Sequence, residues 1–342
     1  MQTNSHSFHR ALAITAARES VAALTDVVQA AIVAAGPNSC IDVLVNGNRE
    51  LATALGAALE KNRPEAEAGS ALNVWHLEFG DKAQTLNVIF HALKRNADLY
   101  YFLDGYARPN HDAFSWLEQA LHDDPCALAA TGVPSLGRSA SRQRVAMQTS
   151  GGLHGNLFVL SPKAMNEIRL REFRLPMGLY RVDSLIGAVL NFSFDPATHP
   201  WTPARIVVVP EASWSFTPLS IWKLDDLQTQ LKRVWRQTGG ALENMAIKDH
   251  LARQRRVAEP LPATASELVL DWWFGHHGPS LRQRLTHPLW NLAIRRFQQS
   301  RDWSKAAEPP LHIFGGTHAI TATPEHQDVT EHSPTISLDT PP

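Results

Sequence analysis

The chain has 342 residues, of which 44% are hydrophobic and 19% charged, and its formal net charge is −1. This composition is typical of a globular protein with a sizeable core, and a near-neutral chain has no overall attraction to nucleic acid. Two cysteines, Cys40 and Cys126, lie far apart, so a disulfide framework is not expected. The first residues lack the pattern of a secretory signal, and no apolar run approaches the roughly 18 residues of a membrane span. We therefore expect a cytoplasmic protein.

Strand-like and helix-like segments alternate between residues 11 and 104. The pattern predicts strands at 11–17, 40–48, 72–79 and 98–104, and helices at 21–36, 49–62 and 81–96. This alternation predicts an α/β fold in which right-handed crossovers build a mainly parallel wound sheet with helices on both faces. The continuous apolar runs of the strands agree with this arrangement, because such strands are buried on both sides.

A polar cluster follows each of these predicted strands: ARES, NGNRE, GDK and DGY, in chain order. Ligands of wound α/β sheets bind beyond the carboxyl ends of the strands, so the clusters indicate a ligand site at that edge. Turn formation alone is the alternative explanation, because Asn, Gly and Asp are common turn residues.

The middle of the chain contains a glycine-rich stretch, TSGGLHGNLFVLSPKAM. It predicts a loop that leads into a strand, with Ser161 and Pro162 at the start of the next helix. Further on, DSLIGAVL predicts a helix opened by Asp183, and ARIVVVPEASW predicts another strand.

The C-terminal third has a different pattern. Apolar residues recur at helical spacing from 218 to 256, which predicts an amphipathic helical region. A second helical stretch, 280–303, is basic and carries three large aromatic residues. We favour packing of this stretch on its own domain, and peripheral contact with the inner face of a membrane is the alternative. Residues 305–342 lack periodicity, which predicts a disordered tail.

The order of the motifs resembles that of the family 2 glycosyltransferases, which have the GT-A fold. The resemblance covers about residues 8–240. It rests on the following stretches, in chain order: AARES (16–20), NGNRE (46–50), GDKAQTLN (80–87), FLDGYARP (102–109), SGGLHG (150–155), GLYRVD (178–183) and, loosely, LQTQLKRVWRQTG (227–239). Two positions depart from the family pattern near the predicted helix starts: Glu50 stands where the family has Asp, and Val182 replaces a Glu.

The resemblance implies an inverting transferase that moves a sugar from a nucleotide-sugar donor, such as a UDP-sugar, to an acceptor hydroxyl. Lys82 would face the donor diphosphate, and Asp104 would hold a divalent cation, Mn²⁺ or Mg²⁺, or the ribose. Asp183 would be the catalytic base. Gly152 and His154 would contact the acceptor. The other residues that the resemblance places at the donor are Ala16, Arg18, Glu19, Asn46 and Glu50.

Each of these residues also has an ordinary structural explanation. Lys82 could be a solvated helix residue, and Asp104 a turn residue before a glycine. Asp183 could be the N-cap of its helix, a role that is compatible with that of a base. His154 could be an ordinary loop histidine.

Tyr106 is the main departure from the family's Asp-x-Asp motif. A phenol with a pKa of about 10 is a poor ligand for a hard cation. Three interpretations follow. The metal is held by Asp104 and the diphosphate alone, or the enzyme needs no metal because Lys82 or arginines such as Arg108 neutralise the charge, or the site has lost its activity.

The favoured hypothesis is a glycosyltransferase acting on a polysaccharide, lipid-linked or small-molecule acceptor. A degenerate GT-A-like binding or scaffolding protein is the first alternative, and a nucleotidyltransferase is the second. The latter would need a glycine-rich basic loop after the first strand, which ITAARES does not supply. The sequence predicts a catalytic domain at 1–217, a helical extension at 218–304 and a tail at 305–342, and leaves the oligomeric state open.

Overall fold

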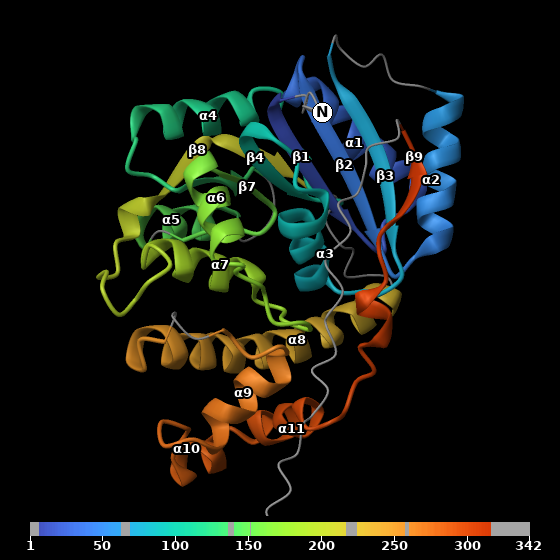
Figure 1. Ribbon diagram of the computed structural model, residues 1–342. Helices are drawn as coiled ribbons and strands as arrows, with labels where there is room; N and C mark the ends of the chain where they lie inside the picture. The colour runs from blue at the N-terminus through green and yellow to red at the C-terminus, as the bar shows by residue number, and fades with distance from the viewer. Residues whose placement is uncertain are drawn as a thin grey trace, which may run out of the picture.

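The computed structural model describes residues 7–62, 69–135, 140–150, 152–216, 224–256 and 260–315. These residues contain a nine-stranded sheet with the order β5-β8-β6-β7-β4-β1-β2-β3-β9 (Figure 1). The strands are β1 (Phe8–Ala16), β2 (Ser39–Asn46), β3 (Ala71–Leu77), β4 (Ala97–Asp104), β5 (Arg108–Pro109), β6 (Ala129–Pro134), β7 (Leu157–Leu160), β8 (Ile206–Ser215) and β9 (Leu311–Phe314).

The parallel part of the sheet is formed by β4, β1, β2 and β3, which pair in that order. Strands β6 and β8 are also parallel, whereas β5, β7 and β9 join their neighbours antiparallel. The predicted α/β fold with a mainly parallel wound sheet is therefore confirmed, and antiparallel strands occur where the sheet continues beyond its parallel centre.

Helices follow most of the strands. They are α1 (Val21–Ala35), α2 (Arg49–Lys61), α3 (Lys82–Val88) with its π-helical continuation η1 (Ile89–Leu93), α4 (Ala113–Asp123), α5 (Ala140–Ser150), α6 (Pro162–Leu170), α7 (Val182–Asn191), η2 (Pro203–Arg205), α8 (Leu224–Lys248), η3 (Asp249–Arg253), α9 (Ala265–Phe274), α10 (Leu281–Thr286), α11 (Pro288–Phe297) and η4 (Ser304–Ala307).

Two apolar cores lie on opposite faces of the sheet. Helices α1, α2 and α4 cover one face and contribute Leu24, Leu55 and Phe114 to its core. Helices α3, α6 and α7 cover the other face, and that core continues into the C-terminal helical layer α8–α11 (Figure 1). The layer is therefore packed onto the sheet domain. The predicted boundary between residues 217 and 218 lies outside the described residues.

Between residues 105 and 150 the sequence analysis predicted no elements, whereas the structure has helices α4 and α5 and strands β5 and β6. Strand β6 pairs with β7 and β8 and is fully buried. It reads AATGVP, and small residues with a glycine and a proline are a weak strand signal. The glycine allows β6 to approach β8 closely, because a Cβ at Gly132 would lie 2.3 Å from the Ala212 carbonyl oxygen of β8.

The prediction of a disordered tail from residue 305 was wrong for its first part. Strand β9 pairs antiparallel with the edge strand β3, and Ile313 and Phe314 pack over Gly56 of α2. The open edge of β3 supplies backbone hydrogen-bond partners, and a four-residue strand is too short for periodicity to reveal. Residues 316–342 lie outside the described part of the chain.

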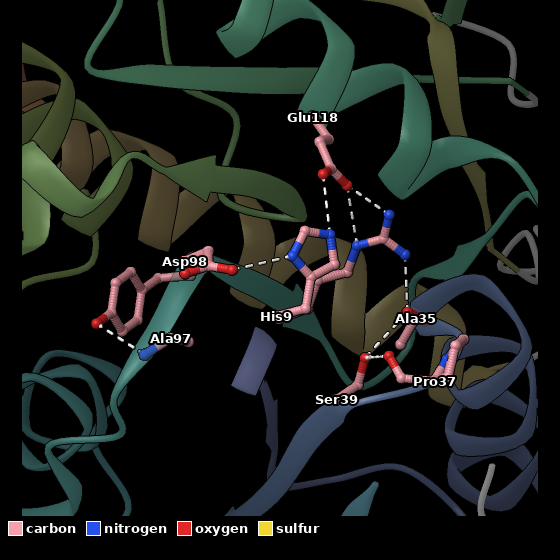
Figure 2. Close-up of polar contacts among 9 residues, drawn as sticks. His9, Ala35, Pro37, Ser39, Ala97, Asp98 and Glu118 are labelled. Atoms are coloured by element: carbon pink, nitrogen blue, oxygen red, sulfur yellow. Dashed lines mark hydrogen bonds and ion pairs between the residues drawn. The ribbon is translucent and has the colours of Figure 1, made fainter. Parts of the chain in front are cut away.

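The amino-terminal end of β1 is held by an ion-pair network. Glu118 of α4 accepts from His9 Nε2 at 2.9 Å, and His9 Nδ1 lies 3.2 Å from Asp98 (Figure 2). Arg10 also donates to Glu118, and its Nη1 donates to the Ala35 carbonyl oxygen at 2.7 Å. These contacts join β1, β4, α1 and α4 at the end of the strand that lies opposite the predicted site.

A buried ion pair stabilises the centre of the sheet. The Asp42 carboxylate on β2 receives two hydrogen bonds from Arg95, both 2.8 Å long. Its Oδ1 also accepts from Trp75 Nε1 at 2.8 Å and from Asn73 Nδ2 at 3.1 Å. The carboxylate is fully hydrogen-bonded, so its burial is compensated.

We expect Asp42→Ala to lower the free energy of unfolding by about 3–5 kcal/mol, because the variant leaves the Arg95 guanidinium buried without its counter-ion. Asp98→Ala is the matched control, since Asp98 is largely exposed and its loss should cost less than about 1 kcal/mol. Denaturant unfolding of both variants measures the difference. Equal effects would contradict a structural role for the buried pair.

Candidate active site

An ion pair joins the end of strand β4 to the start of helix α3 at the carboxyl edge of the sheet. Asp104 is the last residue of β4 and is 7% exposed. Its Oδ1 accepts from the ammonium of Lys82, the first residue of α3, and from Thr15 Oγ1 of β1 at 3.1 Å. Lys82 Nζ also donates to the Gly155 carbonyl oxygen at 3.2 Å. The structure thus brings together two of the predicted donor-binding residues and adds Thr15.

The position of Lys82 is set by the N-cap of its helix. Asp81 Oδ1 accepts from the Gln84 backbone N–H at 2.8 Å, and Oδ2 accepts from the Gly178 N–H at 2.9 Å. Burial raises the pKa of the Asp81 carboxyl, although the hydrogen bonds from the backbone oppose this shift. A single side chain therefore caps the helix of Lys82 and holds the segment that leads to α7.

The glycine-rich loop before β7 lies against this ion pair. A Cβ added at Gly155 would lie 3.4 Å from the Asp183 Cβ and 3.5 Å from Lys82 Nζ. Only a residue without a side chain leaves that space open between the lysine and the aspartate. Gly152 has a φ of +120°, with open space on the side where a Cβ would be, a conformation that favours glycine.

His154, in the same loop, is held in one orientation. Its Nδ1 accepts from the Asn156 backbone N–H at 3.2 Å, which leaves the proton of the neutral ring on Nε2. Nε2 lies 2.6 Å from the side-chain amide of Gln143, and the ring packs on Trp214. Burial lowers the pKa of His154, and the carboxylates of Asp183 and Asp104 partly oppose that shift. A neutral imidazole therefore lines the site.

Asp183 lies in the first turn of α7 and is not its N-cap. The N-cap residue is Arg181, so the predicted capping role of Asp183 was wrong. The helix begins earlier because Val182 is buried in the core and draws the first turn inward. The side chain of Asp183 is partly buried and lies beside Gly155.

Three buried polar side chains hold the segment that precedes Asp183. Asn87 of α3 binds both backbone groups of Leu175, at 2.9 and 2.8 Å. Asp81 binds Gly178 as described above. Glu243 of α8 accepts from the Tyr180 and Arg181 N–H groups at 3.1 and 2.9 Å. The C-terminal helical layer thus takes part in positioning Asp183.

Tyr106 occupies the position at which the resemblance expects a second acid. The residue is 48% exposed, but its hydroxyl donates to Asn156 Oδ1 at 3.1 Å. Desolvation raises the pKa of the phenol, and so does the adjacent Asp104 carboxylate. Tyr106 therefore stays neutral and acts as a hydrogen-bonding residue.

The residues at this edge do not fit a divalent cation held by the protein alone. Asp104 is one carboxylate, and the Lys82 ammonium already balances its charge. The neutral phenol of Tyr106 supplies no second anionic ligand. Within the described residues, no group of three or more His, Cys, Asp or Glu side chains could hold a metal ion.

The other predicted donor-binding residues lie at the neighbouring strand ends. Ala16 ends β1 and packs against Gly105, so only its backbone is available to a ligand. Glu19 accepts from the N–H groups of Ala17 and Arg18 at 2.7 and 2.8 Å, which closes the turn after β1. Arg18 is exposed.

The turn after β2 lies beside the turn after β1. Asn46 is buried at the end of β2, and Glu50 is exposed in the first turn of α2. Asn48, which the sequence analysis did not single out, caps α2 and donates to the Ala17 carbonyl oxygen at 3.0 Å. The two turns thus form one rim, next to the Lys82–Asp104 pair.

Comparison with known proteins supports the fold. No family model matches the sequence, and no curated protein matches it significantly. A solved mannosyltransferase, PcManGT from Pyrobaculum calidifontis in complex with GDP-Man and Mn²⁺, has a TM-score of 0.52 with 13% identity, over 87% of this chain and 77% of that one. The likeness shows the fold: the chain shares the GT-A-type fold of this structure.

Two further solved structures are less similar. Glucosyl-3-phosphoglycerate synthase from Mycobacterium tuberculosis, with Mn²⁺, UDP-glucose and phosphoglyceric acid, has a TM-score of 0.43 and 14% identity over 72% of this chain and 79% of that one. S. aureus TarS has a TM-score of 0.42 and 11% identity over 85% and 80%.

We expect the stability of the protein to depend on pH through Glu243, which is 2% exposed. Burial raises the pKa of this carboxyl from 4.5 to about 7. The folded state therefore keeps a proton that the unfolded state has lost, so the free energy of unfolding falls as pH rises from 4.5 to 7. Relative to Glu243→Gln, the wild type should lose about 3 kcal/mol across this range.

Denaturant unfolding at several pH values measures this difference. Glu267→Gln is the matched control, because Glu267 is an exposed carboxylate of the same helical layer. Parallel pH profiles for the wild type and Glu243→Gln would contradict the prediction.

Proposed function

We propose that the protein is a glycosyltransferase that moves a sugar from a nucleotide-sugar donor to an acceptor hydroxyl with inversion. The observation that carries the proposal is the convergence of the Lys82 ammonium and the Asp183 side chain on Gly155, where a Cβ would lie 3.5 Å from Lys82 Nζ and 3.4 Å from the Asp183 Cβ. Wound sheets bind their ligands at the carboxyl edge of the sheet, where the ion pair of Lys82 lies. The GT-A-type fold supports the same reaction class.

The chemistry needs a cation for the leaving group and a base for the acceptor. As the bond between the sugar and the diphosphate breaks, negative charge grows on the diphosphate oxygen, and the Lys82 ammonium would stabilise it. Asp183 would take the proton of the acceptor hydroxyl as its oxygen forms the new glycosidic bond. An inverting displacement occurs in one step and needs a single base, which acts on the attacking hydroxyl.

The donor would extend from Lys82 along the rim formed by the turns after β1 and β2. Asn46, Arg18 and Glu19 would surround the nucleotide there, with Glu50 at the outer end of the rim. His154 and Gly152, on the side of Asp183, would face the acceptor. The neutral imidazole of His154, both of whose ring nitrogens already have partners, would line the acceptor side without adding charge.

A degenerate binding protein with this fold is the second candidate. It is favoured by one observation, the replacement of the second acid by Tyr106 next to a carboxylate that is already ion-paired. Calorimetric titration with UDP, GDP, UDP-glucose and GDP-mannose, followed by assays of donor hydrolysis, separates the two candidates. Binding with slow hydrolysis supports an enzyme, whereas binding without hydrolysis supports the degenerate protein.

We expect Asp183→Asn to lower sugar transfer by about a hundredfold or more, because the amide cannot accept the proton of the attacking hydroxyl. Donor affinity should change less than about threefold, since Asp183 does not face the nucleotide in this proposal. Asp195→Asn is the matched control, because Asp195 is a half-buried acid beyond α7 whose partners are Ala197 and Thr198, outside the proposed site. Loss of donor affinity in Asp183→Asn alone would instead assign Asp183 to donor binding or to structure.

We expect donor turnover to resist chelation by EDTA and to depend on Lys82. Lys82→Met removes the ammonium and should lower turnover by about a hundredfold to a thousandfold, the usual cost of removing one charge-stabilising group. The assay compares both proteins with EDTA and with added Mn²⁺. If the wild type lost its activity with EDTA and regained it with Mn²⁺, the expected resistance to EDTA would be wrong and Asp104 would be a metal ligand.

A further inference from the structure

The surface formed by α10 and α11 is both apolar and cationic. Leu281 and Leu285 of α10 are each 73% exposed, and Leu289 and Leu292 of α11 are 48% and 45% exposed. Leu281 and Leu285 are four residues apart on α10, and Leu289 and Leu292 are three residues apart on α11, so each pair lies on one side of its own helix. We call these four exposed leucines the leucine face.

The opposite side of α11 already has its partners. Ala293 and Ile294 are buried, and Trp290 and Phe297 pack against the core shared with α8 and α9. The helix is therefore fixed by these inner residues, and the leucine face is not needed to attach it. From the sequence we expected this helical stretch to pack on its own domain. The structure shows that packing for the inner side of α11, whereas Leu289 and Leu292 stay exposed.

Charged residues on this part of the chain are all of one sign. Residues 272–301 contain five arginines and no Asp or Glu. Arg295 and Arg296 are exposed and follow Leu292 by three and four positions, which places them at the end of the leucine face. Arg282 is exposed beside Leu281.

One further apolar side chain borders the leucine face. Phe274 is 64% exposed at the end of α9. Arg284 of α10 donates to the carbonyl oxygen of the adjacent Trp273 at 2.7 Å and stacks on its ring. This contact holds α10 against the end of α9 (Figure 1), the helix that ends at the exposed Phe274.

We propose that the leucine face, with Phe274 and its arginines, docks the protein onto an anionic lipid surface. Leucine and phenylalanine side chains on an exposed helix enter the boundary between headgroups and acyl chains, and arginines bind the anionic headgroups. A soluble partner could cover the leucines, but the exposed arginines Arg282, Arg295 and Arg296 beside them complement an anionic surface. No helix among the described residues has the length and hydropathy of a membrane span.

Sedimentation with vesicles tests this proposal, and it requires neither donor nor acceptor. The full chain should bind phosphatidylcholine vesicles that contain phosphatidylglycerol, bind pure phosphatidylcholine much less, and dissociate as salt is raised. Leu281→Ser with Leu285→Ser should weaken binding at least about tenfold. Leu170→Ser is the matched control, because Leu170 is 78% exposed on α6, and it should bind as the wild type does.

The arginines are tested in the same assay. Arg295→Gln with Arg296→Gln should weaken binding by roughly tenfold to thirtyfold, since each arginine near an anionic surface contributes a factor of about five. Circular dichroism and thermal unfolding check that each variant keeps its fold. No binding by the wild type, equal binding to neutral vesicles, or equal loss in Leu170→Ser would overturn the proposal.

A second copy of the chain is the alternative partner of the leucine face. Light scattering on the same proteins identifies it, because a dimer that the two leucine substitutions convert to a monomer would place a second copy there. A dimer of this kind, together with absent vesicle binding, would also overturn the proposal.

Discussion

The ion pair between Lys82 and Asp104 is the contact on which the site depends. It joins the start of α3 to the end of β4, two segments that the chain brings together only through the parallel sheet. A buried carboxylate without its ammonium would be costly, so the pair holds the start of α3, which Asp81 caps, against the end of β4. The same lysine reaches the Gly155 carbonyl oxygen, and its position therefore also sets the distance between α3, the glycine-rich loop and Asp183.

The acidic side chains around this pair have different tasks. Asp81 and Glu243 accept hydrogen bonds from backbone N–H groups of the segment before α7, so their role is to position that segment. Asp104 is neutralised by Lys82. Asp183 lies at the end of the segment so positioned, next to Gly155, and is the acid best placed to meet a substrate. The C-terminal helical layer contributes to the site through Glu243, which explains why that layer is packed so closely on the sheet domain.

The alternation of strands and helices up to residue 104 could be predicted because each crossover is built from neighbouring residues with a clear period. Strand β9 could not, because its pairing depends on an edge more than two hundred residues earlier. The same difference applies to the site. Lys82, Asp104 and Asp183 stand in recognisable motifs, whereas Thr15 and Glu243 act through contacts with residues 89 and 62 to 63 positions away. Local sequence carries no signal for such contacts.

Charge balance distinguishes this site from one built around two acids. A pair of carboxylates attracts a divalent cation, which then carries the positive charge to a diphosphate. Here Tyr106 and His154 are neutral, Asp104 is compensated by Lys82, and the exposed Arg18 stands on the rim. In the proposed reaction, a diphosphate that approaches Lys82 would compete with Asp104 for one ammonium. Because the carboxylate must keep its counter-ion, the metal-independent turnover that we expect requires the lysine to be shared between the two anions.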